Sequence, residues 1–196
     1  MKKMVCAFAA VLLLLSIGSG SALAAGVEGN INMLLGQKYL DEDDWAPVDT
    51  QAAFGLMFDI TPAGSPIAIA LDIFATEDSA DLYDSYYDEF YEVKGKTQEI
   101  DIGFRWYTPP NMFRAYVGGG LAFVNAEIEV EQYYGYRSSE EDDAIGFFLN
   151  GGFTFALARH LNLGLNVRYS QADVEIAGYD TEAGGVTLAG VVGYHF

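Results

Sequence analysis

Residues 186–196 read VTLAGVVGYHF, and their pattern indicates the fold of the chain. Counted by twos, one face of the stretch carries large apolar side chains and ends in two aromatic rings. Its members are Val186, Leu188, Val192, Tyr194 and Phe196. The opposite face carries mostly small side chains, with Thr187 near one end and His195 near the other. A β-strand with lipid on one side and a crowded interior on the other alternates in this way.

Seven earlier segments repeat this alternation, and each is near the length that a tilted transmembrane strand needs, about 9–11 residues. They lie at about 27–39, 51–60, 67–76, 97–107, 113–126, 144–157 and 161–171. A soluble sandwich is the alternative, but its second face would carry many charges and amides rather than Gly and Ala. We therefore predict an all-β chain that forms an eight-stranded antiparallel up-and-down transmembrane β-barrel.

The connections between these segments alternate between short and long. Short turns are expected at 61–66, 108–111 and 158–160, and long polar loops at about 40–50, 77–96, 127–143 and 172–184. Bacterial outer-membrane barrels have short periplasmic turns and long extracellular loops. An even number of strands brings the first strand beside the last, so that the two can pair and leave no open edge.

The N-terminal segment has the features of a secretory signal peptide. Lys2 and Lys3 precede a short apolar run, and residues 22–24 read Ala-Leu-Ala. We predict that residues 1–25 are cleaved after Ala24 or Ala25 and that residues 26–196 form one barrel domain. The single cysteine, Cys6, lies inside the predicted signal, so the mature chain has no thiol for disulfides or metal binding.

On the eight segments and the ending Val192-Gly193-Tyr194-His195-Phe196, the chain resembles the small eight-stranded outer-membrane proteins of the OmpX and OmpA-transmembrane-domain type. The resemblance implies export through the secretory pathway to the cell outer membrane, where membrane lipid and lipopolysaccharide surround a monomeric barrel. It also implies that the barrel-assembly machinery reads the C-terminal ending during biogenesis. The residues that would carry this assembly signal are Val192, Tyr194 and Phe196.

Charge is concentrated at one end of the predicted barrel. The four long loops contain 23 acidic side chains and three basic ones, in a chain of formal net charge −18. So acidic a chain is a poor candidate for binding nucleic acid, which requires basic side chains at the phosphates. Carboxylates attract divalent cations, and we expect weak binding of such cations by the loops. A dedicated calcium loop is absent, because Ala46 and Ala52 occupy the positions that need Gly and Glu.

Charged side chains also fall on the inward face, where acids and bases are nearly balanced. These residues are Glu28, Lys38, Asp59, Asp72, Glu99, Asp101, Arg105, Arg114 and Arg168. An eight-stranded barrel is just wide enough to hold its own side chains, and a buried charge needs a partner. We expect a polar network that fills the interior, and the alternative is a narrow path for ions or small solutes.

The loops combine aromatic and acidic residues, notably in 82–91 and 133–136. Exposed aromatic rings could contact an extracellular partner or could cap the barrel mouth, and the spacing of Leu82, Tyr86 and Phe90 would suit one face of a short helix. We predict a structural scaffold that presents acidic, Tyr-rich extracellular loops. The alternative is porin-like or OmpW-like transport, through a narrow channel or a lateral-diffusion path for small or apolar solutes.

Enzymatic function is the least favoured class. A lipid-modifying hydrolase needs a nucleophile, a base and an orienting acid. The chain has two histidines, His160 and His195, and neither is followed by serine at H-x-S spacing. The G-x-S-x-G elbow is missing as well. We predict no catalytic residues, no cofactor and no dedicated metal site.

Overall fold

The computed structural model describes residues 26–62, 64–85, 89–109, 111–132, 137–157, 160–176 and 178–196. The predicted signal peptide, residues 1–25, lies outside these ranges. Residues 86–88 and 133–136, at the centres of the two aromatic loops, also lie outside them.

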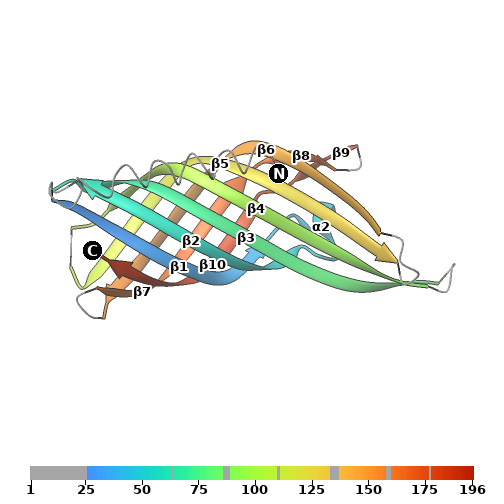
Figure 1. The fold of residues 1–196 in the computed structure, drawn as a ribbon, viewed down its shortest axis with the longest axis horizontal. Helices are drawn as coiled ribbons and strands as arrows, with labels where there is room; N and C mark the ends of the chain where they lie inside the picture. The colour runs from blue at the N-terminus through green and yellow to red at the C-terminus, as the bar shows by residue number, and fades with distance from the viewer. Residues whose placement is uncertain are drawn as a thin grey trace.

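Eight antiparallel strands form a closed barrel, which confirms the predicted fold (Figure 1). Around the barrel the order is β1-β10-β7-β6-β5-β4-β3-β2, so sequence neighbours pair throughout apart from the inserted pair β8 and β9. The barrel strands are β1 (Val27–Tyr39), β2 (Thr50–Pro62), β3 (Ile67–Asp84), β4 (Glu89–Tyr107), β5 (Phe113–Gln132), β6 (Arg137–Ala156), β7 (Leu161–Gln171) and β10 (Gly185–His195).

The first and last strands close the ring. β1 pairs with β10 from Asn30 opposite His195 to Tyr39 opposite Val186. Beyond His195, the backbone N–H groups of Gly29 and Phe196 each donate to the other's carbonyl, both over 2.9 Å. Since every barrel strand therefore has a neighbour on both sides, its backbone groups need no solvent within the wall of the barrel.

The side chains alternate as the sequence predicts. On β10, Thr187, Ala189 and Val191 are buried, whereas Leu188 and Val192 are exposed on the outside. The outward faces of the other strands carry the same exposed Leu, Ile, Val and Phe side chains. An apolar band around the outside of a closed barrel suits contact with lipid. The described part of the chain contains no helix of the length and hydropathy that crossing a membrane requires.

The prediction of a long loop is wrong for two of the four regions. The regions 77–96 and 127–143 are mostly continuous strand, because β3 pairs with β4 as far as Asp84–Glu89 and β5 pairs with β6 as far as Glu131–Arg137. β4 also pairs with β5 out to Tyr91–Gln132, so β3 to β6 extend past the rim as one four-stranded sheet (Figure 1). Pairing across strands outweighs the low strand propensity of the acidic residues.

The short helix expected from Leu82, Tyr86 and Phe90 is also wrong, as far as the described residues show. Leu82 lies in β3 opposite Tyr91, and Phe90 lies in β4 opposite Tyr83. The rings of Tyr83 and Phe90 are 4.9 Å apart between centroids, which is a normal cross-strand aromatic contact. Side chains in this stretch therefore alternate with a period of two residues, as in a strand. The spacing of four residues does not reflect a helix.

The remaining two long connections carry small elements at the same end of the barrel. The first contains a single-turn helix, α2 (Glu42–Trp45), and the second contains the hairpin of β8 (Asp173–Ile176) and β9 (Tyr179–Glu182). Figure 1 shows both beside the extended strands, opposite the end where the C-terminus lies. We call these the long-hairpin end and the short-turn end.

Leu165→Arg tests the assignment of the outward face. Leu165 is 53% exposed on β7, between Gly190 of β10 and Phe153 of β6, and is the middle one of five outward residues on its strand. A guanidinium placed in the centre of the bilayer should lower the free energy of unfolding by about 2–4 kcal/mol. Urea unfolding in phospholipid vesicles would measure this.

Tyr179→Arg is the matched control, because Tyr179 is 75% exposed on the β8–β9 hairpin beyond the barrel wall. It should leave the unfolding free energy nearly unchanged. Equal losses in the two variants would contradict the lipid-facing position of Leu165.

Candidate functional site

The interior of the barrel holds two groups of buried ion pairs. The upper group, nearer the long-hairpin end, consists of Lys38 on β1, Glu99 and Asp101 on β4, and Arg168 on β7. Lys38 Nζ lies 2.5 Å from Glu99 Oε1, and Arg168 Nη2 lies 2.6 Å from Glu99 Oε2 and 2.5 Å from Asp101 Oδ2. All four side chains are at most 1% exposed. Two cations and two anions thus join three strands across the interior.

Neutral donors and acceptors extend the upper group. Lys38 Nζ also donates to Thr97 Oγ1 over 3.0 Å and to the carbonyl of Ala183 over 2.8 Å. The hydroxyls of Thr76 and Thr97 are 2.7 Å apart, and Thr76 also bonds to Gln51. Three hydrogen bonds satisfy the ammonium group of Lys38, which a buried lysine requires.

The lower ion-pair group lies nearer the short-turn end. Arg105 on β4 pairs with Asp59 on β2 and, over 2.6 Å, with Asp72 on β3. Tyr107 donates its hydroxyl proton to Asp59 Oδ2 over 2.5 Å. Arg105, Asp59 and Asp72 are at most 1% exposed. In this group one guanidinium faces two carboxylates. The formal net charge of the group is therefore −1.

Aromatic rings fill the space around the guanidinium groups. The guanidinium carbon of Arg168 lies 4.6 Å from the ring centroid of Phe74 and 5.4 Å from that of Phe148. Such a cation–π arrangement stabilises a charge where water is excluded. Polar and aromatic side chains together therefore occupy the interior of the barrel at both levels.

Two predicted members of the network lie apart from both groups. Glu28 is exposed, and the expectation that it joins the interior network is wrong. It lies opposite Thr61 near the ends of β1 and β2, where the interior opens to solvent at the short-turn end. Arg114 on β5 faces inward with its guanidinium carbon 4.2 Å from the ring centroid of Tyr107, and no carboxylate pairs with it among the described residues.

The interior also contains participants that the charge pattern did not reveal. Tyr107, Tyr116 and Asn166 are buried, and Asn166 donates to the hydroxyl of Tyr116 over 2.8 Å. Thr97 and Gln51 bond within the upper group. Each of these residues lies at an inward-facing position in the period-two alternation of its strand. The alternation therefore predicts that they face the interior, but nothing in the sequence shows that a neutral polar residue belongs to an ion-pair network.

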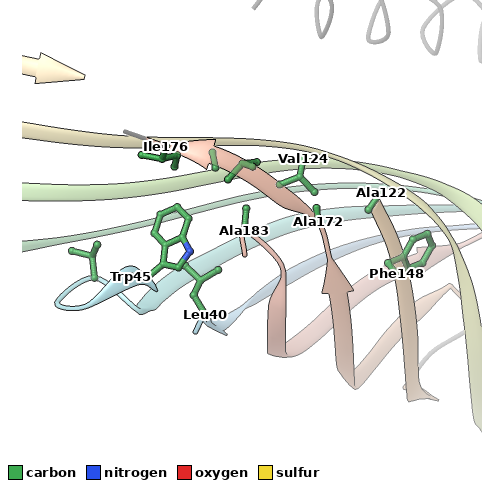
Figure 2. Packing of buried hydrophobic residues seen from close by; sticks show 11 residues of the cluster. Leu40, Trp45, Ala122, Val124, Phe148, Ala172, Ile176 and Ala183 are labelled. Carbon is green, nitrogen blue, oxygen red and sulfur yellow. The ribbon is translucent and has the colours of Figure 1, made fainter. Parts of the chain in front are cut away.

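An apolar cap lies inside the long-hairpin end, and Figure 2 shows how its side chains pack together. We define the cap by its buried cluster, whose members are Leu40, Trp45, Val48, Ala122, Val124, Ala126, Phe148, Ala172, Val174, Ile176 and Ala183. Trp45 is 1% exposed and donates its indole N–H to the carbonyl of Glu182 over 2.7 Å. Asp44 accepts the backbone N–H of Glu182 over 2.8 Å, which fastens α2 to β9.

The extended sheet supplies one wall of the cap. Ala80, Val93, Ile128 and Ala144, one from each of β3 to β6, pack against the buried cluster. The inward face of the extension is therefore partly covered, whereas most side chains on its outward face are half-buried or exposed. The apolar side chains on the inward face of the extension thus form part of the wall around the cap.

The two histidines lie together at the short-turn end. His195 Nδ1 is 3.0 Å from Asn30 Oδ1, and His160 Nδ1 is 2.9 Å from the backbone carbonyl of His195. The ring of His160 stacks on Tyr194 with centroids 5.2 Å apart. Both imidazoles thus have structural partners where the last strand ends beside β1.

The three residues of the predicted assembly signal share the outward face of the last strand. Val192, Tyr194 and Phe196 are 43%, 52% and 46% exposed. They stand on the strand that pairs with β1 to complete the ring. Their role as a signal stays a prediction.

Comparison with protein families gives one match over most of the sequence. The model of the family described as outer membrane protein beta-barrel domain matches residues 10–196. No curated protein sequence matches this chain.

Three solved structures with a similar fold are remote from this chain in sequence. Ail, the attachment invasion locus protein of Yersinia pestis, in complex with the heparin analogue sucrose octasulfate, is 16% identical, with a TM-score of 0.62 over 87% of this chain and 99% of that one. A major outer membrane protein from Thermus thermophilus is 11% identical, with a TM-score of 0.60 over 87% and 99%. Neisserial surface protein A is 13% identical, with a TM-score of 0.51 over 87% and 97%. At these identities the likeness shows the fold alone.

Arg168→Met tests the upper ion-pair group. The substitution keeps much of the side-chain volume but leaves Glu99 and Asp101 buried without their shared cation. Breaking one side of a buried ion pair should lower the free energy of unfolding by about 3–5 kcal/mol. Denaturant unfolding of the refolded protein in detergent micelles would measure the loss.

Two further variants make that result specific. Adding Asp101→Asn to Arg168→Met removes one unpaired charge and should recover part of the lost stability. Arg137→Met breaks the 2.5 Å pair with Glu129, in which Arg137 is 61% exposed, and should cost less than about 1 kcal/mol. A similar loss in the Arg137 and Arg168 variants would show that the upper group contributes no more than a surface pair.

Proposed function

The chain belongs to the outer membrane protein beta-barrel domain family, and from this premise we propose that it is a closed structural barrel in the cell outer membrane that presents an acidic surface for contact with a cationic partner. The observation that carries the proposal is the outward face of the extension of β3 to β6. We call this face the wing. In the proposal the long-hairpin end faces the outside of the cell and the short-turn end faces the periplasm.

The wing continues the outward face of the barrel wall, but its side chains change from apolar to charged. On β3 the outward series passes from Ile73 and Ala75 to Glu77, and on β4 it passes from Ile102 to Lys96. A bilayer explains this change, because the apolar part contacts acyl chains and the charged part stands in water above them. The wing is therefore accessible to a partner.

The register places the charges of the wing in rows across four strands. One row runs Glu77, Lys96, Glu127 and Glu141, and another runs Asp81, Glu92, Glu131 and Arg137. Eight acids stand on this face against three bases. The acids are Glu77, Asp81, Glu92, Glu127, Glu129, Glu131, Glu141 and Asp143, and the bases are Lys94, Lys96 and Arg137.

The bases of the wing are already engaged by its acids. Lys96 lies 3.9 Å from Glu127 and 3.6 Å from Glu129, and Lys94 lies 3.2 Å from Glu92. The hydrogen bond from Arg137 lowers the pKa of the Glu129 carboxyl below its usual value. The surplus of carboxylates attracts cationic groups at a range of about 8–10 Å.

The charge of the wing also determines what it should reject. Ail was solved with sucrose octasulfate, a polyanion. A surface with eight carboxylates repels such a ligand, so we propose that a basic protein, a polyamine or divalent cations bind to this wing instead. This chain and Ail would then bind ligands of opposite charge on the same fold.

The wing makes a direct binding prediction. The refolded protein in nanodiscs should bind poly-lysine more weakly as salt rises, should lose that binding in competition with millimolar calcium chloride, and should not bind sucrose octasulfate. The variant Glu127→Gln/Glu131→Gln/Glu141→Gln should bind poly-lysine several-fold more weakly, because it removes three charges from the two rows on either side of Glu129. Surface plasmon resonance would measure all of these.

The control removes three charges from the neighbouring hairpin through Asp173→Asn/Glu175→Gln/Asp180→Asn. These side chains are exposed on β8 and β9, which are not among the four strands of the wing but adjoin its edge, where the backbone N–H of Glu175 donates to Asp142 Oδ2 over 2.9 Å. Poly-lysine binding should stay near that of the unmodified chain. Equal losses in both variants would reduce the effect to net charge and would remove the wing as a specific surface.

The interior supports a scaffold over a channel. Two levels of ion pairs at most 1% exposed and a cap at the long-hairpin end occupy the lumen. The proposal includes no catalytic step, since the two histidines are engaged by Asn30 and by a backbone carbonyl. Transport through a narrow channel or a lateral path would need these contacts to open.

Planar bilayers test this part of the proposal. The refolded protein should give no conductance steps in 1 M potassium chloride, because the paired charges and the cap block the lumen. A trimeric porin reconstituted in parallel shows that insertion was achieved. Regular steps from the intact chain would support the channel, and faster entry of a small apolar dye into vesicles would support the lateral path.

A further inference from the structure

A polar cavity opens at the short-turn end, on the far side of the lower ion-pair group from the cap. We call this cavity the basin. Its volume is about 140 Å³, and the residues that bear on its chemistry are Asn30, Asn32, Tyr107, Arg114, Tyr116 and His195. One ordered water needs about 10–15 Å³ on such a measure, so the basin has room for a small molecule with several non-hydrogen atoms. Exposed rim residues such as Asn111 border it, and a ligand can therefore enter from solvent.

The basin contains a cation without a counter-ion. Lys38, Arg105 and Arg168 each lie within 2.6 Å of a carboxylate, whereas Arg114 has no acidic partner in the described ranges. Its Nε–H is buried and makes no hydrogen bond, and the guanidinium rests on the face of Tyr107 at 4.2 Å. No carboxylate borders the basin among the residues that the structure describes. A buried donor on a cation costs free energy unless an acceptor reaches it.

A second donor lies beside Arg114. Tyr116 is two residues further along β5, on the same inward face and about 7 Å away along the strand. The Tyr116 hydroxyl oxygen accepts a hydrogen bond from Asn166, which leaves its own proton free to donate. Asn30 is already held by Asn162 over 3.4 Å and by His195 over 3.0 Å, so the wall opposite is fixed. Guanidinium and phenol both border the basin, and each has a hydrogen-bond donor that no acceptor of the described residues occupies.

From this arrangement we propose that the basin is a binding site for a small monocarboxylate, held by the Arg114 fork and the Tyr116 hydroxyl. An arginine fork matches the two oxygens of a carboxylate. The lower ion-pair group behind Tyr107 has two carboxylates for one guanidinium, and this surplus negative charge disfavours a dianion such as phosphate or sulfate. The acids of the wing lie at the other end of the barrel. They are farther away than the distance of about 10 Å beyond which salt screens the interaction between charges.

The side-chain signal of Arg114 gives a direct test. The full chain is refolded in nanodiscs, and the arginine ¹⁵Nε–¹Hε resonances are followed by NMR while sodium acetate is added at constant ionic strength with sodium chloride. A saturable shift of the Arg114 resonance is expected, with none for acetamide, which has the same shape without the charge. Phosphate should bind at least several-fold more weakly than acetate. An equal shift with acetamide or with chloride alone overturns the proposal.

Variants separate the two donors. Arg114→Gln should abolish saturable binding, measured by calorimetry, and Tyr116→Phe should weaken it by about 3–10-fold while keeping the ring and its packing. Arg137→Gln removes an exposed guanidinium at the other end and should leave acetate affinity unchanged. If Arg114→Gln does not fold, Arg114→Lys retains the charge without the fork and should weaken acetate by at least several-fold. Unchanged affinity in Tyr116→Phe and in the Arg114 variant overturns the proposal.

A comparison of ligands identifies the source of the carboxylate. Acetate, N-acetylglycine and a tripeptide with a free C-terminus are titrated alongside the C-terminal amide of the same tripeptide. Tighter binding of the peptide acid than of acetate indicates that a peptide C-terminus is the ligand, and equal affinity indicates a free small acid. Equal binding of the peptide acid and its amide contradicts a carboxylate site. This test does not depend on the wing, so it can fail while the proposed surface function stands.

Discussion

The closure of β1 onto β10 is the contact on which the rest of the structure depends. Inside a bilayer no water is available for backbone N–H and C=O groups, so an open sheet would leave two edges unsatisfied. Ten paired positions between Asn30–Tyr39 and Val186–His195 remove both edges. The pairing joins segments that are about as far apart in the sequence as the barrel allows. Every inward and outward assignment follows once that register is fixed.

Closure of a ring this small decides the character of the interior. An eight-stranded barrel leaves space for side chains and little else, so the charges that face inward must find partners across the lumen. Lys38, Glu99 and Arg168 do so from β1, β4 and β7, which are not neighbours in the wall. The ion pairs therefore connect strands on opposite sides of the barrel. The cap, to which α2 and β8 contribute side chains, packs at one end of these ion pairs.

The two ends of the barrel differ in both shape and charge. At the long-hairpin end four strands continue past the membrane and carry the acidic wing on one face and the wall of the cap on the other. At the short-turn end the interior opens into a basin whose charged group is Arg114. The same alternation of side chains produces all of these surfaces. Two things change along each strand. One is the medium around the outward face, and the other is the extent to which side chains fill the interior on the inward face.

The period-two pattern in the sequence determined the eight strands, the closed antiparallel order and the inward position of Lys38, Asp59, Asp72, Glu99, Asp101, Arg105 and Arg168, because the alternation is a local property of an extended chain. It did not determine which charges pair. Lys38 meets Glu99 across 61 positions and Arg168 meets Asp101 across 67, and such partners depend on the stagger of the strands around the ring.

The tertiary structure alone decided three further features. The acidic stretches 77–96 and 127–143 favour loops by local propensity, yet their described residues are almost all strand because neighbouring strands supply their hydrogen bonds. Glu28 has inward parity but stands at the rim, where the interior is already open to solvent. Arg114 has the same parity as the paired cations but lies below both ion-pair groups, beside Tyr107, where no carboxylate of the described chain reaches it. Local sequence fixes the face on which a side chain stands, and only the closed ring fixes its depth and its neighbours.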